Sequence, residues 1–235
     1  MSMNDLRNGG RSVLIAAPDP LSVVSLAACK AALGIVSTTQ DAMITAAIGA
    51  VVAELDPAFG GWLGRALGVQ TWELQLLSFY DHRLAWRRYC ADAIVLPYPP
   101  LITVTSVKYL DADGVDRTLA LGTGYRVFGL GSLGKQYLAP AYGGSWPVAR
   151  CDEASVRIQF SCGYDGATNK LPPSINAAVA LGVRALLAVS ERNLFLSEDM
   201  VEGVGTKKYI VGSGAGDVVK AAIGQLLVNL SITAL

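Results

Sequence analysis

The chain has 235 residues, of which 52% are hydrophobic and only 16% are charged, whereas about 25% are charged in typical soluble domains. Lysine plus arginine and aspartate plus glutamate each number 19, so the formal net charge is zero, and a nucleic-acid-binding protein usually carries a basic excess. The length fits one large domain or a compact domain with extensions. A surface so poor in charge suits a subunit that buries much of itself against neighbours, although a monomer rich in small residues accounts for the composition equally well.

Cysteine and histidine are too few and too scattered to predict a metal site. The single histidine is His82, and no two cysteines form a C-x-x-C pair, whereas zinc ligands cluster in a sequence. Residues 1–11 lack the apolar core of a signal peptide, and no uninterrupted apolar stretch reaches the roughly 18 residues of a membrane span. We expect a soluble protein made in the cytoplasm, with no metal or cofactor and with reduced, mostly buried thiols. The cysteines are Cys29, Cys90, Cys151 and Cys162.

Residues 1–17 are predicted to form a flexible N-terminal arm. Asp19 and Pro20 then supply an N-cap and a first-turn proline. A helix is therefore expected over 21–33, ended by Gly34.

A second, longer helix is expected to follow a cap at Thr38 or Thr39. Asp56-Pro57 ends it, because proline cannot continue a helix. Its apolar residues recur at the spacing of one helix face: Met43, Ile44, Ala47, Ile48, Val51, Val52 and Leu55.

The middle of the chain, residues 69–171, predicts an antiparallel β module. Alternating and β-branched residues mark the strands, and the turn at 111–114 reads Asp-Ala-Asp-Gly, which favours a hairpin. The expected strands cover 70–79, 94–96, 103–110, 115–119, 125–128, 136–138 and 154–162.

The longest predicted helix starts at Pro172-Pro173 and runs to about Leu194, apolar around most of its girth. Residues 197–235 form a tail, in which we expect a strand over 208–211 and a helix over 217–230. The end of this tail is too apolar to remain in water, so it docks on its own domain or on a partner. Its candidate interface residues are Leu226, Leu227, Val228, Leu230, Ile232 and Leu235.

A second candidate contact is a basic, aromatic segment between two predicted strands. It contains Arg83, Trp86, Arg87 and Arg88, next to His82. Because no further basic stripe accompanies it, a solvated loop or a subunit contact is expected here rather than a DNA site.

Glycine patterns raise the question of nucleotide binding. Gly129, Gly131 and Gly134 satisfy G-x-G-x-x-G, but that fingerprint has meaning only where a helix opens at the glycines. A strand follows instead, so we interpret these residues as a hairpin loop. The glycines at 212–216 do precede a helix, but the chain stops before a second strand completes a nucleotide fold.

Other chemical motifs are equally incomplete. Asp111, Asp113 and Asp116 resemble the start of a calcium loop without its flanking helices or closing glutamate. A histidine-dependent nucleophile has only His82, beside Asp81, and no G-x-S-x-G elbow is present. The sequence therefore predicts no enzymatic activity, although carboxylate pairs that meet only in space are not visible at this stage.

Several short pieces follow one another in a fixed order over about residues 20–195, and together they resemble the head–tail connector (adaptor) family of long-tailed bacteriophages and gene transfer agents. After residue 195 the likeness is partial, since residues 228–235 are apolar where members usually carry a basic, aromatic run. The pieces are Gly64-Arg65-Ala66-Leu67, Gln70-Thr71-Trp72-Glu73-Leu74, Leu96-Pro97-Tyr98-Pro99-Pro100-Leu101, Val104-Thr105-Ser106-Val107-Lys108-Tyr109, Asp111-Ala112-Asp113-Gly114, Tyr125-Arg126-Val127, Ser145-Trp146-Pro147, Gly163-Tyr164, Leu171-Pro172-Pro173-Ser174-Ile175 and Glu191-Arg192-Asn193.

The resemblance implies an α+β fold in which the N-terminal helices and the long helix form a bundle, with the antiparallel β module inserted between them. The connector domain then spans 18–196, with its bundle at 18–68 and 172–196 and its β module at 69–171. Residues 1–17 and 197–235 are the arm and the tail.

The resemblance also implies a structural virion protein with no catalytic residues and no cofactor. Such proteins form a homo-oligomeric ring, a dodecamer in the particle, beneath the portal protein at the head–tail junction. The ring extends the channel through which DNA passes without sequence specificity, and it offers a platform to the stopper or another tail-proximal connector protein. Two alternatives stay open: another virion ring subunit, such as a stopper or tail terminator, and a small-molecule-binding enzyme.

Overall fold

The computed structural model describes residues 10–80, 92–132, 134–191, 198–201, 205–208 and 214–232. It confirms the α+β class: helices at the N-terminal side pack with helices from the C-terminal half, and antiparallel sheets form the middle of the chain. The chain divides into two compact units. The β unit comprises 1–23, 53–171 and 230–235, and the helical unit comprises 24–52 and 172–229.

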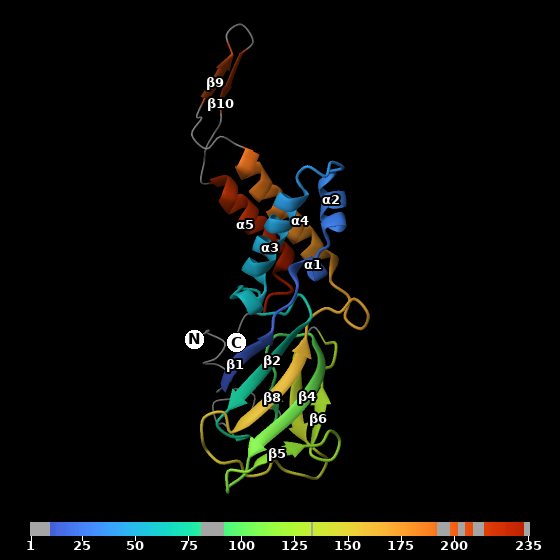
Figure 1. The fold of residues 1–235 in the computed structure, drawn as a ribbon, viewed down its shortest axis with the longest axis vertical. Coiled ribbons are helices and arrows are strands. Elements are labelled where there is room, and N and C mark those ends of the chain that lie inside the picture. The colour runs from blue at the N-terminus through green and yellow to red at the C-terminus, as the bar shows by residue number, and fades with distance from the viewer. Residues whose placement is uncertain are drawn as a thin grey trace. The chain divides into compact units, whose positions relative to one another are not determined.

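The larger sheet of the β unit has five antiparallel strands in the order β1-β2-β8-β4-β5, which lie side by side in Figure 1. Buried and half-buried residues alternate strictly along β2 and β8, so one face of the sheet carries the core. The strands are β1 (Gly10–Ala16), β2 (Gln70–Leu76), β4 (Leu101–Leu110), β5 (Asp116–Leu119) and β8 (Val156–Cys162).

A second sheet of three strands, in the order β3-β7-β6, shares the core of the first. Its strands are β3 (Ile94–Val95), β6 (Tyr125–Phe128) and β7 (Tyr137–Pro140). The aromatic rings of Phe79 and Trp146 stack in this core, with their centroids 4.8 Å apart. Both sheets therefore contribute to one continuous hydrophobic core, as expected for two packed β layers.

Residues 10–16 correct one expectation, because the sequence predicts a flexible arm over 1–17. These residues form β1, whose backbone pairs with β2 from Gly10 opposite Leu76 to Ala16 opposite Thr71. The partner strand lies about sixty residues further along the chain, and such a long-range pairing leaves little mark on the local sequence. Residues 1–9 of the predicted arm lie outside the described residues.

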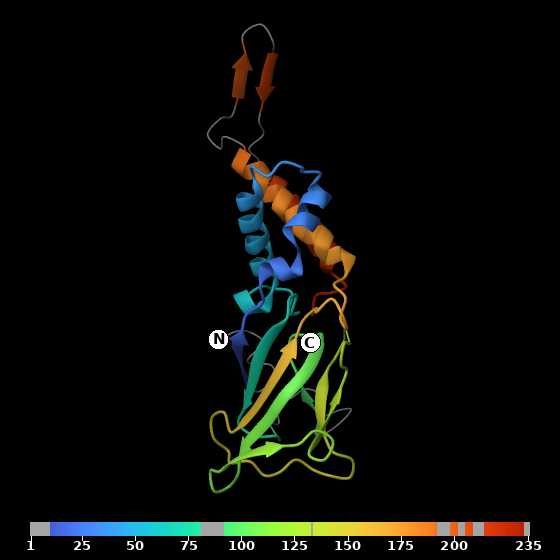
Figure 2. The same ribbon diagram turned by 45° about the vertical axis from the view of Figure 1, so that its right-hand side comes forward.

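The helical unit is built around α4, which contacts both α2 and α5 (Figure 2). Gly182 of α4 lies against Val51 of α3, close enough that a Cβ on the glycine would meet both Val51 γ-methyl groups at 2.9 Å. None of the described helices has both the length and the hydropathy of a membrane span. The helices are α2 (Leu26–Leu33), α3 (Asp41–Leu55), which belongs to this unit up to Val52, α4 (Pro173–Glu191) and α5 (Gly214–Leu227).

The helix predicted over 21–33 is divided in two. The β unit holds the short helix α1 (Pro20–Val23), and α2 begins at Leu26. Ser25 has extended backbone angles, and its hydroxyl accepts a hydrogen bond from the Ala28 amide at 3.2 Å. Serine is a preferred N-cap, so a second helix starts there.

The C-terminal elements are also shifted relative to the prediction. The described strands are β9 (Glu198–Val201) and β10 (Gly205–Lys208), which form a two-stranded antiparallel sheet of their own. The expected strand over 208–211 overlaps them only at Lys208, and 209–211 lie outside the described residues. Helix α5 begins three residues before the predicted 217 and ends three before the predicted 230.

Candidate assembly surfaces

The described end of the tail is held in the β unit by its backbone. The side chain of Leu230 is buried, and its carbonyl oxygen accepts a hydrogen bond from the buried Arg65 Nε at 3.0 Å. The Ile232 amide donates to the Leu63 carbonyl at 3.1 Å. Gly64 has a φ of +68°, and a Cβ there would lie 3.3 Å from the Ile232 carbonyl oxygen. Residues 230–232 thus dock on their own unit, one of the two outcomes that the apolar tail predicts.

The loop that receives this tail is organised by a buried carboxylate, Asp56. Its side chain has no exposed surface, and it accepts hydrogen bonds from the backbone amides of Ala58 and Leu67, both at 2.8 Å. The Gln70 amide Nε2 donates to both carboxylate oxygens at 3.1 Å. Gln70 Oε1 in turn accepts from Trp72 Nε1 at 2.9 Å. The network connects residues 56–67 to the first residues of strand β2.

Burial and hydrogen bonding act in opposite directions on the pKa of Asp56. Burial raises the pKa most, and the bonds from Ala58, Leu67 and Gln70 lower it, with a net rise above the ordinary 3.8. Burial likewise raises the pKa of the Cys162 thiol well above its ordinary value, and the Asp56 carboxylate adds to that rise. Both groups are interior and out of reach of a ligand in solution.

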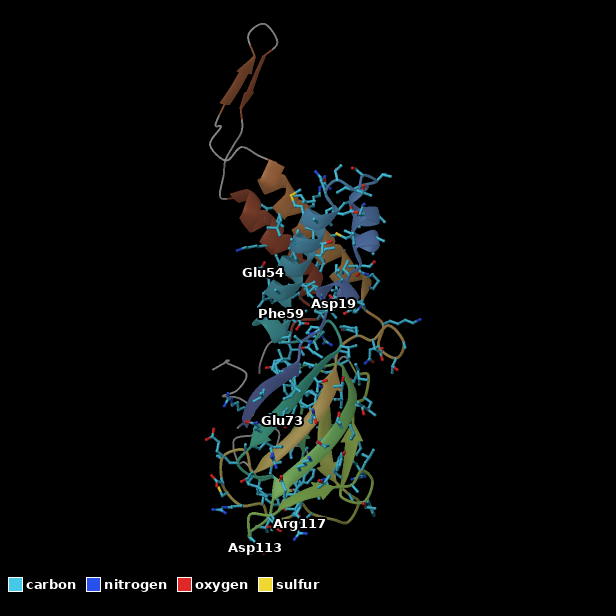
Figure 3. All side chains as sticks on the ribbon, viewed as in Figure 1. Asp19, Glu54, Phe59, Glu73, Asp113 and Arg117 are labelled. Atoms are coloured by element: carbon cyan, nitrogen blue, oxygen red, sulfur yellow. The ribbon has the colours of Figure 1, made fainter. Side chains whose placement is uncertain are left out.

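Beside this loop, apolar side chains reach the surface. Phe59, which ends the 3₁₀ turn η1 (Pro57–Phe59), is 44% exposed, Trp62 is 49% exposed and Ile232 is 38% exposed. The Ile232 amide donates to the carbonyl of Leu63, which follows Trp62, and Phe59 ends η1, which begins two residues after the end of α3 (Figure 3). We refer to these three exposed apolar residues, Phe59, Trp62 and Ile232, as the aromatic patch, after the two that are aromatic. Exposed apolar groups held on an ordered backbone are typical of contact surfaces.

The candidate interface residues of the tail fall into two groups. Leu227 and Leu230 are buried within the chain, whereas Leu226 is 41% exposed and Val228 is 61% exposed. Together with Ile232, Leu226 and Val228 are the candidate tail residues whose side chains lie at the surface. Leu235 lies outside the described residues.

The basic segment with Arg83, Trp86, Arg87 and Arg88 also lies outside the described residues, as does His82. Its predicted role as a subunit contact stays a prediction.

The glycines of the G-x-G-x-x-G pattern lie in the connection between β6 and β7, which pair as an antiparallel hairpin. Gly129 has a φ of +79° and Gly131 a φ of +66°, a backbone conformation that suits glycine in a tight connection. The strand β7 follows the loop, so the interpretation as a hairpin loop is confirmed.

Two of the aspartates that resemble a calcium loop, Asp111 and Asp113, lie in the turn between β4 and β5, and Asp116 is the first residue of β5. The Asp111 carboxylate accepts from the amides of Asp113 at 3.1 Å and Val115 at 2.9 Å, and from Arg117 Nε at 2.8 Å. These bonds hold the pKa of Asp111 below its ordinary value, the Arg117 bond most strongly. Figure 3 labels Asp113 and Arg117 at this end of the sheet. The hairpin turn accounts for these residues.

Within the described part of the chain, no three His, Cys, Asp or Glu side chains gather closely enough to hold a metal ion. The cysteines there are free thiols, buried at Cys29 and Cys162 and exposed at Cys151. Cys90 lies outside the described residues.

The fold and these surfaces define an α+β protein with apolar side chains exposed at its surface. No protein-family model and no curated protein matches the chain. Among solved structures it is similar to a chain in the neck of an empty gene transfer agent (GTA) particle, computed with C6 symmetry. The sequence identity is 19%, the match covers 96% of this chain and 97% of the other, and the TM-score is 0.60.

Two further structures show the same likeness. A chain in the virion of a native GTA particle has 20% identity, with 95% and 97% of the two chains covered and a TM-score of 0.59. A chain in the neck of a native GTA particle, computed with C12 symmetry, has 18% identity, the same coverage and a TM-score of 0.51. The two units together therefore have the fold of a GTA neck chain over nearly their whole length.

Proposed function

We propose that this chain is a structural protein of the neck of a virus-like particle, the adaptor that joins head to tail. In this role it forms a ring beneath the portal protein, lengthens the DNA channel and offers the attachment platform for the tail. The observation that carries the proposal is the fold match to GTA neck chains, which covers at least 95% of this chain and 97% of the other. A match of this extent includes the segments of both units in the same order along the chain. It is therefore more than a likeness of a single domain that many proteins share.

Cyclic symmetry of the similar necks supports a ring. Those structures were computed with C6 and C12 symmetry. A closed ring needs a heterologous contact, in which two different surfaces of each copy meet. The chain offers separate exposed apolar surfaces for such a contact: the aromatic patch in the β unit, and Leu226 and Val228 in the helical unit.

The helical unit favours an adaptor over a stopper or tail terminator, the other ring subunits considered. We expect stopper and terminator subunits to be β-rich barrels that lack long N-terminal helices. Here α3 and α4 have 15 and 19 residues, and α4 has buried residues on more than one face, including Ile175, Val179 and Ala180.

The proposal is tested by deleting the gene for this chain and examining the particles by electron microscopy. We expect DNA-filled or leaking heads to accumulate beside separate, complete tails, because both assemble but are not joined. Supplying the chain in trans restores joined particles. If the deletion yields normal tailed particles, the proposed function is wrong.

A further inference from the structure

The hairpin of β9 and β10 pairs with no other strand in the described part of the chain. Among the described strands, β9 and β10 pair only with each other. The paired residues run from Val201 opposite Gly205 to Glu198 opposite Lys208. An isolated two-stranded hairpin is marginally stable in water. Its two outer edges also leave backbone N–H and C=O groups free to pair with another chain.

The two strands carry opposite charges. Glu198 and Asp199 lie on β9, whereas Lys207 and Lys208 lie on β10. The register places Lys207 opposite Asp199 and Lys208 opposite Glu198. One edge of the hairpin therefore belongs to an acidic strand and the other edge to a basic strand.

We propose that neighbouring copies of this chain pair through these hairpins, with the basic β10 of one copy along the acidic β9 of the next. The inference rests on the proposed ring and names one of its subunit contacts. Since β9 and β10 run antiparallel, the repeated order β9-β10-β9-β10 continues one antiparallel sheet from copy to copy. When the ring closes, this sheet closes as well and no edge stays open.

The charges select this head-to-tail contact over a two-fold one. Pairing β9 with β9, or β10 with β10, would set like charges on adjacent strands, which is destabilising. Such a contact would also stop at two copies, because both partners use the same edge. Pairing β10 with β9 sets opposite charges at every contact and leaves each copy with its other edge free for the next.

Charge exchange tests the contact in assembled particles. The E198K/D199K variant has two basic strands, and the K207E/K208E variant has two acidic strands. Each alone brings like charges together between copies, so we expect about a tenfold or greater loss of joined particles. When the two variants are produced together in equal amounts, alternating copies again set β10 and β9 of opposite charge side by side, and joined particles return.

This mixture separates a contact between copies from a contact within one hairpin. In the mixture every single hairpin still has two like-charged strands, so recovery requires pairing between copies. If the mixture is as defective as either variant alone, the proposal is wrong. The matched controls are K135E/K170E and D113K/E153K, which make the same charge changes at exposed positions of the β unit and should leave joining unchanged.

Zero-length carbodiimide cross-linking gives an independent readout, because it joins a lysine amine only to a carboxylate in contact with it. In particles that contain a mixture of ¹⁴N- and ¹⁵N-labelled copies, we expect mixed-label links between residues 198–199 and residues 207–208. If these links join residues of one copy only, the contact is internal and the proposal fails.

Replacing residues 198–208 by a Gly-Ser linker distinguishes this inference from the proposed function. If particles with the linker carry a complete ring and joined tails, the hairpin contact is wrong and the neck function stands. If tails join in the absence of the whole chain, the neck function itself is wrong. We expect neither result, and instead rings that are absent or incomplete with the linker.

Discussion

Asp56 illustrates how a single side chain organises the segment that receives the tail. The residue caps η1 through the Ala58 amide, holds the Leu67 amide and orients Gln70, which in turn holds the indole of Trp72. A buried charge is tolerated only when its oxygens are satisfied in this way. The network therefore couples the end of α3 to the start of the central sheet.

Removing this carboxylate should destabilise the protein strongly. Asp56→Ala removes the acceptor of the Leu67 and Ala58 amides and leaves Gln70 Nε2 with only its bond to the Gly68 carbonyl, and each unsatisfied buried group costs about 1–3 kcal/mol. We expect the free energy of unfolding, measured by urea denaturation, to fall by about 3 kcal/mol or more. Asp113→Ala, at an exposed turn position, should change it by less than about 0.5 kcal/mol; equal effects would contradict this account.

The pH dependence of stability should carry the signature of Asp56. Because its pKa is raised above the ordinary 3.8 in the folded protein, the folded state binds this proton more tightly than the unfolded state. The resulting stabilisation is complete at low pH and is lost as pH rises through the folded pKa.

The comparison with Asp56→Asn isolates this titration, since Asp111 and Asp165, whose pKa values are lowered, are present in both proteins. Urea unfolding between about pH 4 and pH 7 should show the advantage of the natural protein over the variant shrinking as pH rises. A constant or growing advantage would show that the Asp56 pKa is not raised.

At the scale of elements, Gly182 sets how closely α3 and α4 pack. Alanine is better than glycine within a helix by about 1 kcal/mol, but a Cβ at 182 would meet both γ-methyl groups of Val51 at 2.9 Å. Valine has little rotamer freedom in a helix, and overpacking usually costs about 1–3 kcal/mol. We expect Gly182→Ala to lower the free energy of unfolding.

Gly224 of α5 is the matched control, because nothing lies within 4 Å of a Cβ there. Gly224→Ala should raise the stability by about 0.5–1 kcal/mol. Adding Val51→Ala to Gly182→Ala should recover part of the loss, since it removes the methyl groups that clash. Thermal unfolding that ranks Gly182→Ala and Gly224→Ala equally would show that the two helices do not pack through Gly182.

Local patterns predict most of these elements, and long-range pairing explains the ones that the sequence does not reveal. The turn at Asp111 and the strands beside it are readable because their chemistry is local. Strand β1 depends on a distant partner, and the cap at Ser25 lacks the Glu or Gln three residues later that marks a capping box. From the sequence, Asp56 is predicted only to end a helix. Its hydrogen-bond partners Leu67 and Gln70 are more than ten residues away and come close to it only in the folded loop.

At the scale of the whole molecule, the two kinds of surface have different tasks in the proposed ring contact. A hairpin edge supplies directional backbone bonds and charge, which set the order of copies. An apolar patch supplies buried area, which holds them together. The candidate tail residues divide accordingly: Leu227 and Leu230 stabilise the chain itself, and Leu226, Val228 and Ile232 stay at the surface.

The aromatic patch should therefore matter for assembly more than for folding. Trp62 is 49% exposed, and the bond from its amide to the Glu54 carbonyl at 3.3 Å fixes its backbone position. Exposed tryptophan on an ordered backbone is a frequent hot spot, where truncation costs about 2 kcal/mol or more of binding. We expect Trp62→Ala to reduce joined particles by about tenfold or more.

The same variant should change the free energy of unfolding by no more than about 1 kcal/mol, because half of the indole is already in water. Tyr142→Ala, at a side chain that is 93% exposed, is the control for losing a surface aromatic and should leave both joining and stability unchanged. Normal joining by Trp62→Ala would remove the aromatic patch from the ring contact. A loss of joining by Tyr142→Ala as well would mean that exposed aromatic residues contribute in general, and that the position of Trp62 beside the docked tail has no special role.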